Sequence, residues 1–294
     1  MGGSAYWFHS RAYNSSQLVQ MLPPDRSAYV YLDVALLRSA GVLDEIAGSP
    51  SLEDADYKKF ISETGFDYRE DLDGLAIAFR DGDRYFAAQG RFEWEKLAAY
   101  APAHGGKCER FLCTAPGSEP GRNVSYYMPR NNILAIATSR TATAGDMVAP
   151  GSWQNGPRVP DVGLWVLVPP YVLTDLGQAP AIAKPFLTPL AQAASTVFTL
   201  GAARGKEGFE VRMEVTAKDP AGAAKISAQF TEGTALLVKL MGREKVQADP
   251  ADLSGVLAAG KFEAKDATVT GTWPISRAFV KSLASGVSLG GQAK

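Results

Sequence analysis

The sequence is poor in the residues on which most enzymes and metal sites depend. Its 294 residues include only two histidines, His9 and His104, and two cysteines, Cys108 and Cys113. A structural zinc site would need all four of them as ligands, and nucleophilic catalysis of the Ser-His-Asp type needs a histidine or an equivalent base. Glycine-rich dinucleotide-binding strings and phosphate-binding loops are absent as well. We therefore expect no metal and no nucleotide cofactor.

The chain also lacks an excess of charge of either sign. It has 30 basic and 31 acidic residues, for a formal net charge of -1, and no basic run stands out. Binding to nucleic acid requires a concentrated positive patch. The composition therefore argues against a nucleic-acid partner. The length is that of about two domains and allows a large apolar core.

What the sequence does contain is an order of elements that occurs twice. An apolar strand is predicted at residues 28–34 and again at 162–168, and a long hairpin at 75–92 and again at 195–217. Each hairpin leads into a helix, then further strands and a closing helix. This order predicts an α+β fold of two similar halves, each of mainly antiparallel sheet with packed helices, and a possible internal duplication.

Prolines and glycines mark the boundary between the halves, because both residues interrupt regular elements. The predicted linker is 151–160, between a first half at 18–150 and a second half at 161–287, with a frayed tail at 288–294. The preceding residues, 1–17, contain the aromatic run Tyr-Trp-Phe, which is typical of the interfacial end of a membrane span. We interpret them as a leader or the remnant of a membrane anchor, with a disordered leader as the alternative.

The two cysteines are close together in the sequence. Cys108 and Cys113 flank a short predicted turn between two strands, which can bring facing Cβ atoms near disulfide geometry. A disulfide would indicate an oxidising compartment outside the cytoplasm. The alternative is a pair of reduced thiols in a cytosolic protein.

Several local signals predict where elements turn or begin. Asp81-Gly82 favours the tight turn of the first hairpin. Asp219-Pro220 and Asp249-Pro250 each combine a helix cap with a proline in the first turn, and predict two helix starts. Pro185 and Pro189 predict that the helical stretch around them is short or kinked.

Aromatic residues are the candidates for a ligand or partner surface. The set considered is Tyr126, Tyr127, Trp153, Trp165 and Trp273. Aromatic side chains provide large apolar contact areas in binding sites, but at strand spacing they also fill cores and sheet faces. Both interpretations stay open at the level of the sequence.

Parts of the first half resemble uncharacterised bacterial extracytoplasmic proteins of acidobacteria-like lineages. The resemblance rests on Leu22-Pro23-Pro24-Asp25 ahead of the strand, on Thr64-Gly65-Phe66-Asp67 and Asp71-Leu72-Asp73, and on Gly90-Arg91-Phe92. These proteins carry an N-terminal membrane anchor and have no known activity. The resemblance implies a tethered protein that faces outward.

Taken together, these features predict a non-enzymatic, extracytoplasmic binding or assembly protein, tethered to a membrane, with a protein partner or a membrane complex. Two alternatives remain. The protein could carry an apolar small molecule in a cavity between helices and sheet, or it could be an enzyme with a carboxylate pair assembled from distant positions.

Overall fold

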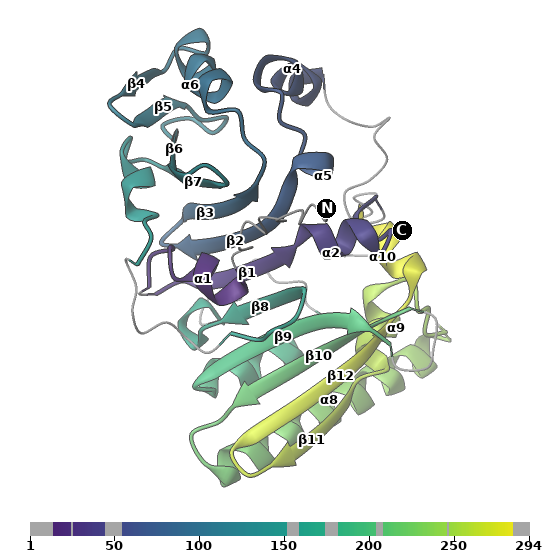
Figure 1. Ribbon diagram of the computed structural model, residues 1–294. Helices are drawn as coiled ribbons and strands as arrows, with labels where there is room; N and C mark the ends of the chain where they lie inside the picture. The colour runs from purple at the N-terminus through teal and green to yellow at the C-terminus, as the bar shows by residue number, and fades with distance from the viewer. Residues whose placement is uncertain are drawn as a thin grey trace, which may run out of the picture.

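The computed structural model describes residues 14–24, 26–44, 55–151, 159–173, 182–203, 208–245 and 247–284. Within these ranges the chain forms one 12-stranded sheet in the order β11-β12-β10-β9-β8-β1-β2-β3-β7-β6-β5-β4 (Figure 1). Every pair of neighbouring strands in it is antiparallel. The predicted α+β class with mainly antiparallel sheet is therefore confirmed.

The strands are β1 (Ala28–Asp33), β2 (Leu72–Arg80), β3 (Asp83–Gly90), β4 (Lys107–Glu109), β5 (Leu112–Pro116), β6 (Asn123–Arg130), β7 (Ile133–Ser139), β8 (Leu164–Val168), β9 (Ser195–Ala202), β10 (Phe209–Thr216), β11 (Lys261–Lys265) and β12 (Thr268–Ile275). The α-helices are α1 (Ser15–Val19), α2 (Val34–Ser39), α4 (Ala55–Thr64), α5 (Tyr68–Asp71), α6 (Trp94–Ala103), α7 (Lys184–Leu187), α8 (Pro220–Glu244), α9 (Leu253–Ala258) and α10 (Arg277–Ala284). Short 3₁₀ helices are η2 (Ala144–Met147), η3 (Pro170–Leu173) and η4 (Thr188–Gln192).

The two halves meet at the centre of the sheet, where β1 pairs with β8. From this junction the strand order outward is β1-β2-β3-β7-β6 in the first half and β8-β9-β10-β12-β11 in the second. The predicted repetition of element order is thus present in the topology, and the first half adds the β5–β4 hairpin at its edge. A duplication as the origin of this order stays a prediction.

Local signals set the strand register in the first hairpin. The turn residues Asp81 and Gly82 have φ values of 50° and 84°, the positive values that the predicted Asp-Gly turn requires. In β2 the buried positions alternate with half-buried ones, so Ala76 and Ala78 lie on one face while Leu75 and Ile77 lie on the other.

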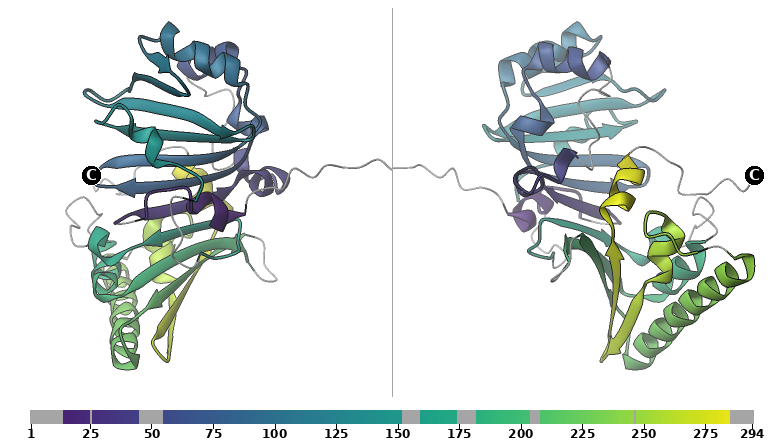
Figure 2. Two further views of the ribbon diagram at one scale, coloured as in Figure 1. Left: turned by 60° about the vertical axis from the view of Figure 1, so that its left-hand side comes forward. Right: turned by 90° about the vertical axis from the view of Figure 1, so that its right-hand side faces the viewer.

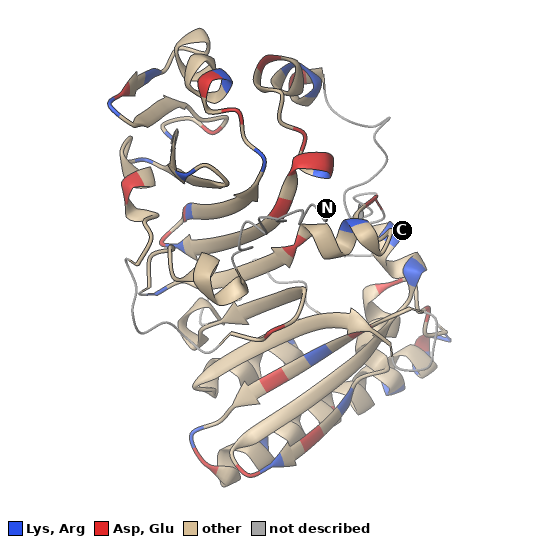
Figure 3. Cartoon of the chain, in the orientation of Figure 1, with Lys and Arg blue, Asp and Glu red and all other residues tan. Residues whose placement is uncertain are grey.

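Helices cover the two halves differently (Figure 2). In the first half both faces of the sheet are covered: Leu18 and Leu22, from α1 and the turn after it, join one core cluster, and Leu97 of α6 joins another. In the second half the core cluster combines one face of β10 and β12 with α7, α8, α9 and α10. The opposite face of β10 carries the exposed side chains Arg212 and Glu214, so that face is open to solvent (Figure 3).

The long helix α8 begins and ends where the sequence predicts. The Asp219 side chain accepts a 2.7 Å hydrogen bond from the Gly222 backbone N–H, and Pro220 occupies the first turn. The helix ends at Lys245, whose φ of 57° is left-handed. Its inward face is buried against the sheet, through Ala223, Ile226, Phe230, Leu237 and Met241.

The predicted start of the next helix at Asp249 is wrong by a few residues. The capping residue of α9 is Asp252, which accepts a 2.7 Å hydrogen bond from the Gly255 N–H. Asp249 instead accepts from the Ala251 N–H within the preceding turn. Gly255 packs so closely on the Asp249 carbonyl that a Cβ at Gly255 would lie 1.9 Å from that oxygen. This close contact is consistent with a turn at Asp249 and with a helix that begins after Asp252.

The close approach of Gly106 to β5 gives a test of the packing at the end of α6. A Cβ at Gly106 would lie 2.0 Å from the Thr114 backbone oxygen, whereas a Cβ at Gly201 would meet no atom within 4 Å. We expect Gly106→Ala to lower the free energy of unfolding by about 1–3 kcal/mol through overpacking. Gly201→Ala should change it by less than about 0.5 kcal/mol. Urea unfolding of the two variants measures both, and equal stabilities would contradict the described packing.

Candidate functional site: an apolar pocket in the second half

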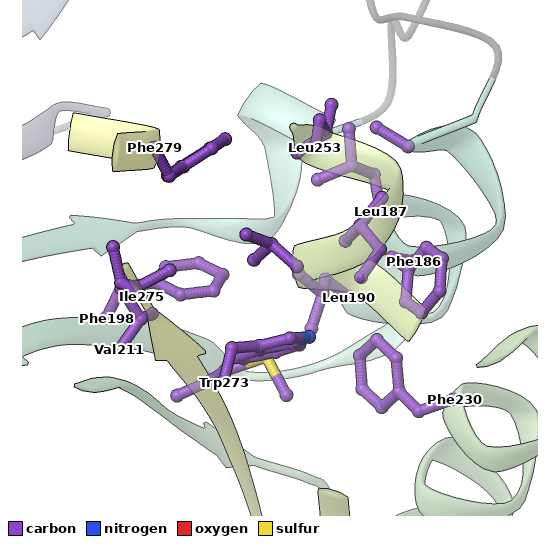
Figure 4. A pocket seen from close by; sticks show the side chains of 14 residues that line it. Phe186, Leu187, Leu190, Phe198, Val211, Phe230, Leu253, Trp273, Ile275 and Phe279 are labelled. Atoms are coloured by element: carbon purple, nitrogen blue, oxygen red, sulfur yellow. The ribbon is translucent and has the colours of Figure 1, made fainter. Parts of the chain in front are cut away.

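A pocket of about 240 Å³ lies between the sheet of the second half and the helices that cover it (Figure 4). We call it the apolar pocket, because the side chains that line it are all aliphatic, aromatic or thioether groups. It belongs to the core cluster of the second half rather than to the junction with the first.

Three neighbouring strands form the floor of the apolar pocket. Its floor residues are Phe198 of β9, Val211 and Met213 of β10, and Trp273 and Ile275 of β12. They share one face because strand side chains alternate and the register places Met213 beside Phe198 and Val211 beside Trp273. The alternation of apolar and charged residues along β10 therefore determines both the floor of the pocket and the polar opposite face.

Short helical segments form the walls and roof. Phe186, Leu187 and Leu190 come from α7 and η4, and Val256 comes from α9. The helical segment that contains Pro185 is indeed short, as predicted, because α7 has four residues and η4 follows it directly. Such segments cover the sheet without the continuous contact that a long helix makes.

Stacked aromatic rings close one side of the apolar pocket. Phe230 of α8 lines it and stacks on Phe262 with ring centroids 4.8 Å apart and on Phe186 at 6.5 Å. Trp273 meets Phe262 edge to face, at 5.3 Å. Offset and edge-to-face pairs of this kind add to the stability gained from burial alone. These ring contacts hold the side chains on this side of the pocket in place.

The described side chains of the apolar pocket can make only apolar contacts, apart from the Trp273 ring nitrogen. Among the described residues that line it there is no carboxylate, imidazole, hydroxyl or ammonium group. The Trp273 ring nitrogen is buried and makes no hydrogen bond within the described part of the chain. These side chains can exclude water and hold apolar groups, and none of those described supplies an acid, a base or a nucleophile.

The aromatic residues singled out from the sequence do not form one surface. Tyr126 is buried against α6, while Tyr127 and Trp165 belong to the core cluster on the other face of the first half. Trp273 alone of the four described residues lines the apolar pocket. Trp153 lies outside the described residues. The four described residues therefore lie in separate parts of the structure and cannot together form one partner surface.

The predicted disulfide is confirmed. Cys108 of β4 and Cys113 of β5 stand directly opposite each other in the ladder and are bonded. Cys113 is fully buried and belongs to the core cluster that also contains Tyr126 and α6 residues. The disulfide therefore links the two strands of the outermost hairpin, and its Cys113 end packs in the core of the first half.

His104 follows α6 and contacts α4, away from the apolar pocket. Its Nε2 lies 2.6 Å from a carboxylate oxygen of Glu63, and its ring stacks on Tyr100 with centroids 4.0 Å apart. Among the residues that the structure describes, no three His, Cys, Asp or Glu side chains gather as a possible metal site. The contacts of His104 therefore connect α6 with α4.

Comparison with known proteins finds likeness in solved structures. No protein-family profile and no curated protein sequence matches the chain. Crystal form III of TP0453 is similar over 90% of this chain and 97% of that one, with 14% identity and a TM-score of 0.51. Crystal forms IV and I give TM-scores of 0.46 and 0.44, each with 13% identity. At this identity the likeness to form III concerns the fold alone.

None of the helices in the described ranges combines the length and the apolar composition that crossing a bilayer requires.

Burial of Tyr126 predicts how stability depends on pH. Burial raises the pKa of the Tyr126 phenol to about 12 from 10.0, and its hydroxyl donates a 2.8 Å hydrogen bond to the Leu97 carbonyl. The folded state therefore favours the protonated phenol. The resulting contribution to the free energy of unfolding is complete below pH 10 and is lost as pH rises toward 12. We expect Tyr126→Phe to lower stability at pH 7 by about 1 kcal/mol, and to reduce the alkaline loss. Urea unfolding between pH 7 and 12 measures both effects, and an unchanged alkaline slope would contradict the assignment.

Proposed function

We propose that this protein is a non-enzymatic, extracytoplasmic binding protein that carries an apolar small molecule in the apolar pocket. The observation that supports the proposal is the pocket of about 240 Å³, in which every described lining residue is apolar. Concave sites lined mainly by hydrophobic and aromatic side chains are where proteins most often hold small molecules. A ligand supplies the contacts that the lining side chains lack.

The volume of the apolar pocket limits the size of the ligand that it can hold. An engineered apolar cavity of about 150 Å³ stays dry and binds benzene, whereas drug-sized ligands use pockets of about 300–1,000 Å³. At about 240 Å³ the pocket lies between these cases. We infer a compact hydrocarbon group, whether a small molecule or the apolar part of a larger one.

The location outside the cytoplasm is supported by the disulfide. Cytoplasmic thiol systems keep most cysteines reduced, and structural disulfides persist mainly in oxidising compartments. Cys108 and Cys113 are bonded, and Cys113 is fully buried. The proposal includes a membrane tether ahead of residue 18, for which the support is the aromatic run in the leader and the resemblance to anchored proteins.

An assembly role is the second candidate, and it is favoured by exposed apolar side chains at the edge of the first half. Phe111, at the tip of the disulfide hairpin, is 58% exposed, and Met147 of η2 is 44% exposed. Beside them lies a cleft of about 420 Å³ that includes Lys107, Arg110 and Asp146. An aromatic side chain with a charged surround is a common anchor in protein interfaces.

Filling the apolar pocket tests the carrier function. Val256 points into it from α9, so Val256→Phe should occupy its volume with little loss of stability. We expect the wild-type protein to bind the neutral apolar dye N-phenyl-1-naphthylamine with one-to-one stoichiometry, and Val256→Phe to bind it at least about tenfold more weakly. Dye fluorescence measured against protein concentration gives both constants.

The matched control is Val197→Phe. Val197 lies on β9 and lines a separate, partly polar cleft on the opposite face of the sheet, so its replacement should leave dye binding unchanged. Equal binding by wild type and Val256→Phe would contradict the carrier function. Purification of the protein from its own cells with a stoichiometric protein partner, and without any extractable apolar compound, would favour the assembly role instead.

Trapping of thiols in intact cells tests the location. If the protein faces an oxidising compartment, rapid acid quenching followed by alkylation should leave both Cys108 and Cys113 unmodified until reductant is added. Mass spectrometry of the peptide that contains both residues counts the modified thiols. Recovery of the doubly alkylated peptide without reductant would contradict an extracytoplasmic location.

A further inference from the structure

Aromatic side chains stand around the apolar pocket on several sides. Those among its described lining are Phe186, Phe198, Phe230, Trp273 and Phe279. Figure 4 shows Phe186 and Phe230 at one end of the pocket, Phe198 and Phe279 at the other, and Trp273 between them. A molecule held in the pocket therefore meets aromatic rings at both of its ends.

The rings at the two ends of the pocket differ in their neighbours. Phe186 and Phe230 stack on each other, so each already has an aromatic partner. At the other end Phe279 is buried and Phe198 is half-buried, yet neither ring has an aromatic neighbour among the residues that the structure describes. Trp273 meets one ring, edge to face. Phe198 and Phe279 therefore lack the partners that the rings at the opposite end have.

Aromatic rings attract one another through their charge distribution as well as through the area that they bury. The face of a ring is negative and its edge is positive, so rings favour offset-stacked and edge-to-face contacts with centroids about 4.5–7 Å apart. An aromatic ligand can make such contacts with Phe198 and Phe279, whereas an aliphatic ligand of similar size gains only from burial. The thioether of Met213, on the floor of the pocket, also makes favourable contacts with aromatic rings.

We propose that the ligand of the apolar pocket is a small neutral aromatic molecule, bound with its ring against Phe198 and Phe279. This inference rests on the proposed carrier function and adds the chemical class of the ligand. The bound ring supplies Phe198 and Phe279 with the aromatic partner that the described chain does not provide. The pocket therefore selects an aromatic compound over an aliphatic one of the same carbon skeleton.

The lining and the volume of the pocket also limit the charge and the size of this ligand. No described residue that lines the pocket carries a charged group, so an ionised ligand would be buried there without a partner, which is unfavourable. The volume of about 240 Å³ exceeds that of an engineered cavity of about 150 Å³ that binds benzene. A single substituted ring, or two fused rings, suits this volume.

Two ligands with the same number of carbon atoms test the proposal. Toluene is aromatic and methylcyclohexane is not, and each is titrated against bound N-phenyl-1-naphthylamine, whose own dissociation constant is measured for every variant. Phe198→Leu and Phe279→Leu each replace a ring with an aliphatic group. We expect each variant to weaken the binding of toluene relative to that of methylcyclohexane by about three- to tenfold. The transfer of each ligand from water is the same for all variants, so it cancels in this comparison.

The matched control is Ile275→Leu, which exchanges one aliphatic isomer for another in the lining of the same pocket. It should change the relative affinity for the two ligands by less than about twofold, because it removes no ring. A second measurement needs no variant. In the wild-type protein, nuclear Overhauser effects should connect the ring protons of bound toluene with those of Phe198 and Phe279.

The results separate this inference from the carrier function on which it rests. Equal weakening of both ligands in the two ring variants would overturn the aromatic class and leave the carrier function in place. The same conclusion follows if toluene contacts only the aliphatic side chains Leu187 and Leu253, or if it fails to displace a bound dye. If neither the dye nor either ligand binds, the carrier function and this inference fail together.

Discussion

The pairing of β1 with β8 is the constraint on which the rest of the structure depends. It joins two halves of the same strand order into one sheet, and across it Trp165 stacks on Tyr31, with ring centroids 5.9 Å apart. Trp165 has no exposed surface. Because side chains alternate along both strands, the register of this pair also decides which side chains of each half share a face of the sheet.

The apolar pocket follows from how the second half covers that face. One long helix, α8, packs on it continuously through five buried residues, while α7, η4, α9 and α10 are short segments. Pro185 and Pro189 keep the segments before β9 from forming a longer helix. Short pieces that meet at their ends cannot interdigitate with the floor residues as fully as a long helix does, and a volume remains among them.

Local features could be predicted from the sequence because neighbouring residues determine them. Asp81-Gly82 requires a particular turn, Asp219 caps α8, and Cys108 and Cys113 face each other across a short hairpin. The predicted start of α9 is wrong because Asp249 and Asp252 are both suitable helix caps, and the sequence does not decide between them. In the structure Asp252 caps the helix, and Gly255 packs on the Asp249 carbonyl. The residues of the apolar pocket come from segments far apart in the chain. Periodicity shows which of them are buried, but it does not show whether the space between them is filled.

The carrier function depends on that space being accessible to an apolar molecule, and a crystal of the protein pressurised with xenon measures this most directly. Xenon is apolar and enters dry cavities without a specific chemical partner. The account predicts a strong xenon peak between Trp273, Phe230 and Val256, with little movement of the lining side chains. A lining that has closed on itself, with no xenon between the sheet and α9, would contradict it.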